Sequence, residues 1–167
     1  MPSPDNWNVQ SWDGEWIAGE TAGGSRNNLD SFHLNPQFHI TLTDPDEFDD
    51  SDLCTLLVSL IQKRERNQQD DQELISIGFV IYRIKKKINQ GTMFFQYFLF
   101  LVSSGVNLDT NFFKTNRSVA RSKTFCNMRE VSGRFQLPPG EYVVIPSSFL
   151  PNLEGKFLLR TFTEEKI

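Results

Sequence analysis

Short runs of aromatic and β-branched residues, separated by polar connectors, restrict most strongly how this chain can fold. Residues 37–43 alternate strictly, with Phe38, Ile40 and Leu42 on one face and polar side chains between them, the period of a half-buried β-strand. Further runs of strand length occupy residues 53–61, 74–82, 94–102, 125–129, 142–145 and 157–162, and another strand is expected to begin at Trp16 and Ile17. Together they predict an all-β fold, an antiparallel β-sandwich or barrel.

The connectors support one domain. Pro138-Pro139-Gly140 stands immediately before the run that begins at Glu141, and because proline cannot donate into a strand ladder, it predicts a turn followed by a strand start. Arg129 to Phe135 are compatible with one helical turn between strands. We expect residues 1–167 to form a single domain, with residues 1–11 as an extended lead-in.

Charge is divided unevenly along the sequence. Residues 1–83 hold 15 acids and 5 bases, a net of −10, whereas residues 84–167 hold 6 acids and 12 bases, a net of +6. Such a division orients a domain against a charged neighbour if folding keeps the charges apart, and it has no such effect if folding mixes them.

The most acidic segment lies between two predicted strands. It contains Asp44, Asp46, Glu47, Asp49, Asp50 and Asp52. This density of carboxylates suits calcium, which takes about six to eight oxygen ligands, or a basic protein surface, although a solvated loop has the same composition. A second group, Asp70, Asp71 and Glu73, ends a later connector. The two groups share one calcium ion only if both connectors lie at the same end of the sandwich.

Basic residues form two groups. The first is Lys85, Lys86 and Lys87, and the second is Arg117, Arg121, Lys123, Arg129 and Arg134. Lys85, Lys86, Lys87, Arg121 and Lys123 are candidates for contacts with phosphates or with an acidic partner, including anionic phospholipid, and an ordinary solvated face is the alternative. We expect no nucleic acid, because acids are in excess and no basic motif is interleaved with aromatic residues.

Catalysis has little support. His33 and His39 are the only histidines, and neither Cys54 nor Cys126 has the surroundings of a reactive thiol. Paired Cys or His spacings typical of zinc do not occur. The segment after Met1 does not resemble a secretory signal, and both cysteines lie in strand-like patterns. We therefore expect reduced cysteines, a cytoplasmic protein and no enzymatic activity of this chain.

Two long segments resemble a known family. The first is WDGEWIAGETAGGSRN at residues 12–27, followed by Phe32 and by Asn35-Pro36-Gln37. The second begins ARSKTF at residue 120 and continues through NMREVS at residue 127, Arg134-Phe135 and LPPGEY at residue 137 to Ile145-Pro146-Ser147. Ile77-Gly78-Phe79 and Tyr82 match a strand between them. The chain thus resembles the domain that follows the papain-like protease core in the calpain large subunit, often called domain III.

The resemblance implies a C2-like sandwich of about eight strands, without the catalytic residues, which lie in the protease core. It also implies that the acidic loop at residues 44–52 faces that core or a neighbouring domain, with calcium loosening the contact, and that calcium or phospholipid binds. Calcium is accordingly the one possible cofactor. A spacer without ion or lipid binding is the alternative function. The aromatic run within residues 91–108 departs from the family pattern, and a buried edge strand, an exposed partner surface and a poorly packing segment all fit it.

Overall fold

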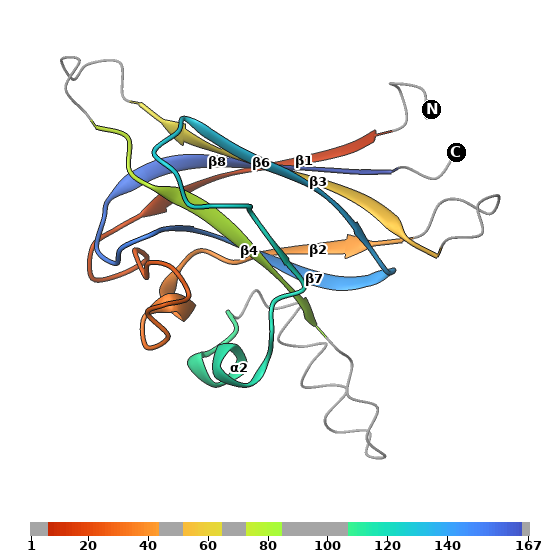
Figure 1. Cartoon of the computed structure of the whole chain (residues 1–167), viewed down its shortest axis with the longest axis horizontal. Helices are drawn as coiled ribbons and strands as arrows, with labels where there is room; N and C mark the ends of the chain where they lie inside the picture. Colours follow the sequence, from red (N-terminus) through yellow and green to blue (C-terminus); the bar gives the residue numbers. More distant parts are fainter. Residues whose placement is uncertain (1–6, 44–51, 65–72, 85–106, 165–167) are drawn as a thin grey trace.

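Two antiparallel sheets face each other in the computed structural model, which describes residues 7–43, 52–64, 73–84 and 107–164 (Figure 1). The first sheet has the order β1 (Trp7–Trp16), β8 (Gly155–Glu164), β3 (Cys54–Lys63) and β6 (Glu130–Leu137). The second has the order β2 (Phe38–Leu42), β7 (Gly140–Ser148), β4 (Ile77–Ile84) and β5 (Ala120–Arg121). The predicted antiparallel β-sandwich of eight strands is therefore confirmed for the described residues.

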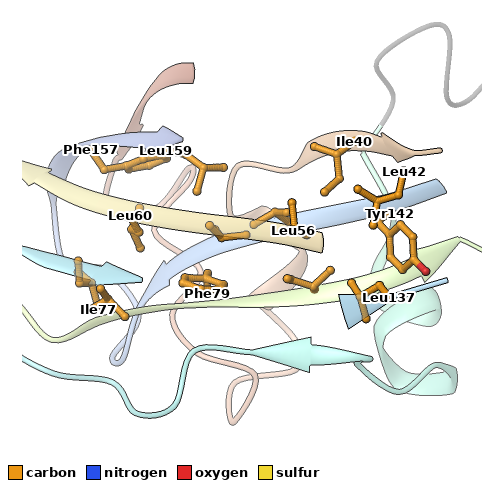
Figure 2. Close-up of a cluster of buried hydrophobic side chains, with 14 of the residues drawn as sticks. Ile40, Leu42, Leu56, Leu60, Ile77, Phe79, Leu137, Tyr142, Phe157 and Leu159 are labelled. Carbon is orange, nitrogen blue, oxygen red and sulfur yellow. The ribbon is translucent and has the colours of Figure 1, made fainter. Parts of the chain in front are cut away.

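The main core fills the space between the sheets, because alternate side chains of each strand point inward. Leu56 and Leu60 of β3 meet Ile77 and Phe79 of β4, as Figure 2 shows, and all four are fully buried. The Trp16 ring stacks at 4.5 Å from Phe157 on the partner strand β8, and the indole nitrogen donates to the Pro146 carbonyl at 3.2 Å. That hydrogen bond joins the two sheets across the core.

A second core covers the outer face of the β2–β7–β4–β5 sheet. Val80, Tyr82 and Ile84 of β4 project to this side and pack against Phe32 and Phe113. Phe32 belongs to the short 3-10 helix η1 (Phe32–Leu34), and Phe113 belongs to α2 (Thr110–Thr115). Burial on both faces explains why β4 and β7 are nearly continuous apolar runs rather than alternating ones.

The helix α2 was not predicted from the sequence. Its start is set by Asp109, whose side chain accepts a hydrogen bond from the Phe112 amide at 2.9 Å, the usual role of an N-cap residue. Phe112 and Phe113 then both pack on the Tyr82 ring, with centroids 5.9 and 5.0 Å away. This short helix is stable because its contacts with Tyr82 bury both aromatic side chains.

Three local expectations differ from the structure. β1 begins at Trp7, within the expected lead-in of residues 1–11, and ends at Trp16, where a strand was expected to begin; pairing with β8 along its whole length sets these bounds. The helical turn expected within Arg129–Phe135 is wrong: this segment lies largely in β6, which pairs with β3 from Cys54 to Ile61. Tertiary pairing overrides local propensity there. Residues 125–129 make one isolated bridge, Cys126 with Ile77, instead of a strand.

Other expectations agree or lie outside the description. No disulfide joins Cys54 and Cys126, as expected for reduced cysteines. The strand expected at residues 94–102, and residues 91–106 of the aromatic run, lie outside the described residues.

Candidate functional site

The acidic segment begins and ends on strands of opposite sheets. It follows β2, whose last residue Leu42 pairs with Gly140, and it precedes β3, whose first residue Cys54 pairs with Leu137. Both attachment points therefore lie beside the tight turn between β6 and β7. Asp44, Asp46, Glu47, Asp49 and Asp50 are outside the described residues, whereas Asp52 is described and exposed. The structure thus gives the place where the segment attaches.

The triple lysine segment leaves from the same end of the sandwich. Lys85, Lys86 and Lys87 are outside the described residues, but β4 ends immediately before them at Ile84, which pairs with Glu141. The Leu137–Glu141 turn is thus shared by the strand ends that carry the acidic and the basic segment. Charges of opposite sign are attached near one another although about forty positions separate them in the sequence.

The second acidic group attaches at the opposite end. Glu73 is exposed and precedes β4, while Asp70 and Asp71 lie outside the described residues. The connector that carries the group starts after Lys63, the last residue of β3, whereas Asp52 stands before its first residue. A ten-residue strand is roughly 30 Å long. Asp52 and Glu73 therefore do not share a cation, and the condition for one joint calcium site is not met.

Glu73 instead lines a hollow of mixed charge. This hollow, of about 350 Å³, also contains Glu15, Glu154, Lys63 and Lys156. Lys63 of β3 forms an ion pair with Asp13 of β1, which lies on the other side of β8 in the same sheet. Across the described residues, no three His, Cys, Asp or Glu side chains are grouped closely enough to hold a metal ion.

The second basic group is split by the fold. Arg121 is an exposed residue of the edge strand β5, and Lys123 lies exposed two positions later. Arg121 and Arg117 line a hollow of about 510 Å³ at this edge. Lys123, Arg129 and Arg134 do not line it, so the group gathered in sequence is not one surface.

The third arginine of this hollow, Arg26, was missed by the sequence analysis. Arg26 lies in the loop between β1 and η1, and its Nη2 donates to the Phe113 carbonyl at 3.2 Å and to the Asn116 carbonyl at 3.4 Å. Cations are favourable at a helix C-terminus, where carbonyls lack partners. The only sequence signal was its place in the WDGEWIAGETAGGSRN segment, which identifies a family rather than a contact.

The loop that carries Arg26 is held rigidly. Asn35 is fully buried, and its Oδ1 accepts from the Gly23 amide at 3.1 Å while its Nδ2 donates to the carbonyls of Gly24 and Phe32 at 2.8 and 3.0 Å. At the other end, Asp30 forms an ion pair with Lys114 of α2 at 2.9 Å. The position of Arg26 over the sheet edge is thus set by the fold.

Tyr82 lies beneath this arginine. Its hydroxyl is enclosed and makes no hydrogen bond of regular geometry within the described part of the chain. Burial raises the pKa of Tyr82, and the nearby positive charge and donor groups of Arg26 oppose the rise. The neutral phenol is therefore the form that the site holds at physiological pH.

The two histidines have different surroundings. The Nδ1 of His33 lies 2.8 Å from the Thr110 hydroxyl, which joins η1 to α2. Both ring nitrogens of His39 are enclosed without a hydrogen-bond partner among the described residues, and burial lowers the pKa of His39 while Glu141 opposes this.

Comparisons with known proteins agree with this architecture. The family model described as "Calpain large subunit, domain III" matches residues 12–162. The human calpain-2 catalytic subunit is 44% identical over 163 residues, covering 96% of this chain and 22% of the relative. Calpain-A of Drosophila melanogaster is 43% identical over 159 residues, covering 95% of this chain and 18% of the relative. Calpain-1 of Rattus norvegicus is 43% identical over 166 residues, covering 96% and 22%.

The fold defines a β-sandwich domain of two four-stranded antiparallel sheets. Within that class, the chain belongs to the calpain large-subunit domain III family. It spans about a fifth of the length of the curated relatives it matches. Among the described residues, no helix is long and apolar enough to cross a membrane.

Proposed function

We propose that this chain is a non-catalytic regulatory domain of a calcium-dependent cysteine endopeptidase of the calpain type. Its acidic segment, residues 44–52, contacts a basic surface of the protease core or of a neighbouring domain, and calcium weakens this contact by neutralising the carboxylates. The curated relatives are catalytic subunits of calpains and are about five times longer than this chain, which leaves ample parent chain to provide that surface.

One observation carries the proposal. The strand ends that hold the acidic segment and Lys85–Lys87 lie around the same β6–β7 turn. A high density of negative charge is therefore attached next to a compact group of positive charge, at one end of a rigid sandwich. A contact between the acidic segment and a basic partner responds to any cation that screens or binds the carboxylates.

Two further residues belong to the proposal in a different role. Arg121 and Lys123, both exposed, provide contacts with phosphate or with an acidic partner near the β5 edge. The second acidic group, Asp70, Asp71 and Glu73, is assigned no share in the calcium site, because Glu73 lies at the far end of β3 from Asp52.

Isothermal titration calorimetry with calcium tests the ion part. The test variant replaces Asp46, Glu47, Asp49 and Asp50 by Asn or Gln, and a matched control replaces Glu15, Asp30, Glu73 and Glu154, which removes equal charge elsewhere. We expect the wild-type protein and the control variant to give binding heats with calcium, and the test variant to give none. Identical heats in all three proteins would refute the calcium site.

Sedimentation with liposomes separates regulation from a spacer role. A regulatory domain that recognises anionic phospholipid pellets with phosphatidylserine vesicles and not with phosphatidylcholine vesicles. Failure to pellet with or without calcium, together with absent calcium heats, favours the spacer. Neither experiment requires the rest of the parent protein.

A further inference from the structure

The hollow at the β5 edge contains three arginines without a neutralising acid. Arg26 enters from the loop after β1, Arg117 from the segment between α2 and β5, and Arg121 from β5 itself, with Ser118 completing the polar lining. No carboxylate lines it within the described part of the chain. Neither Arg117 nor Arg121 forms an ion pair with a described residue. Three arginines thus line one open hollow of about 510 Å³.

The wall of the hollow is rigid. The Val119 amide donates to the Ile81 carbonyl at 2.8 Å, and Ser122 bonds Phe79 through its backbone amide at 2.9 Å and its hydroxyl at 3.1 Å. The segment that carries Arg117 and Arg121 is therefore anchored to β4 on the C-terminal side of Arg117. Arg26 is anchored from the opposite side by the two carbonyls at the end of α2. These anchors fix the backbone that carries the arginines before a ligand binds, which lowers the ordering cost of binding.

The chemistry of the hollow selects an oxyanion. A guanidinium group presents parallel N–H donors that match two oxygens of a phosphate or a carboxylate. Three uncompensated guanidinium groups favour a dianion with three oxygens over a carboxylate with one charge and two oxygens. The Nη2 of Arg26 is occupied by the helix carbonyls and its guanidinium also acts on the Tyr82 hydroxyl, but the side chain is exposed and lines the hollow.

The geometry points to a binding site for a phosphate monoester in this hollow, with Arg26, Arg117 and Arg121 as its ligands. The site extends the phosphate contact proposed above for Arg121, but it excludes Lys123 and does not involve the acidic segment. A result that refutes calcium binding by the acidic segment therefore does not refute the phosphate site. A result that refutes the phosphate site likewise does not refute calcium binding. The same phosphate chemistry comes from a soluble metabolite or from a lipid headgroup.

Two probes distinguish the two sources of phosphate: glycerol 3-phosphate represents a soluble metabolite, and phosphatidic acid represents a lipid headgroup. Glycerol 3-phosphate is titrated while the backbone amide resonances of Ser118 to Arg121 are followed by NMR, and vesicles of phosphatidylcholine with phosphatidic acid are used for cosedimentation. The test variant is Arg117→Gln with Arg121→Gln, which spares Arg26 because that side chain also holds α2. The matched control, Arg129→Gln with Arg134→Gln, removes the same charge from exposed residues outside the hollow.

We expect at least one probe to bind the wild-type chain and the test variant to bind it about tenfold more weakly or worse, as for the loss of a charge-assisted hydrogen bond. The control should bind within about twofold of wild type. Binding of glycerol 3-phosphate indicates a soluble ligand, and binding of the vesicles alone indicates a lipid headgroup. Absence of binding by both probes, equal loss in both variants, or tighter binding of a hexaglutamate peptide would overturn the proposal.

Discussion

Removal of the Asn35 side chain should destabilise the protein more than its size suggests. Asn35→Ala deletes three hydrogen bonds, to the Gly23 amide and to the Gly24 and Phe32 carbonyls, and all three backbone partners belong to buried residues. Each lost hydrogen bond costs about 1 kcal/mol, and a buried group left without a partner costs about 1–3 kcal/mol. Allowing for overlap between these contributions, we expect a loss of about 3–4 kcal/mol in the free energy of unfolding.

Gln37 provides a matched comparison in the same loop. Its side chain also makes three hydrogen bonds, two as donor to the His33 and Leu108 carbonyls and one as acceptor from the Leu108 amide. However, Gln37, His33 and Leu108 are only partly buried, so water replaces the lost partners in Gln37→Ala. We expect this substitution to cost about 1 kcal/mol.

Urea unfolding followed by tryptophan fluorescence measures both effects. With a slope of about 2 kcal/mol per molar urea, Asn35→Ala should lower the midpoint by about 1.5–2 M and Gln37→Ala by about 0.5 M. Equal shifts would show that burial of the backbone partners does not set the cost, and would refute the reasoning. A shift for Asn35→Ala below that for Gln37→Ala would refute it more directly.

Two further perturbations test the packing. Burial lowers the pKa of His39 from 6.5, so the unfolded state binds the proton more tightly than the folded state. The contribution of His39 to stability should therefore be full above pH 6.5 and should fall as the pH drops through and below that value. In urea unfolding, His39→Gln should reduce this dependence of stability on pH. A persistent slope in that variant would assign it to other groups. A Cβ at Gly14 would lie 2.2 Å from the Phe157 ring, whereas one at Gly155 makes ordinary contacts at 3.6 Å. Gly14→Ala should therefore cost about 1–3 kcal/mol and Gly155→Ala under about 1 kcal/mol in thermal unfolding, and equal costs would argue against tight packing at Gly14.

The strands were predictable where a local pattern carried them. Residues 37–43 became β2 because their alternation separates a core face from a polar face. The proline pair at 138–139 marked the turn before β7 because proline has no amide to pair. In contrast, the segment within Arg129–Phe135 became part of β6 through pairing with β3, a partner about 70 positions away, and no local signal reports such a partner.

The candidate site was less predictable for the same reason. Acidic and basic groups were visible in the sequence, but the end of the sandwich at which each attaches depends on strand order. The order placed Glu73 away from Asp52 and brought the flanks of the acidic segment to the strand end that precedes Lys85. The fold also separates the members of the second basic group, since Arg117 and Arg121 line the hollow while Lys123 does not.

By itself, the sequence of this protein determined the antiparallel sandwich and its likeness to calpain domain III, because strand alternation, turn residues and long motifs are written locally along the chain. Only the tertiary structure decided that Arg26 meets the end of α2, 90 positions away at Asn116, and that it joins Arg117 and Arg121 around one hollow. The physical reason is that hydrophobic burial selects strands by their apolar faces, whereas the neighbours of an exposed charge are set only when the sheets pair and pack.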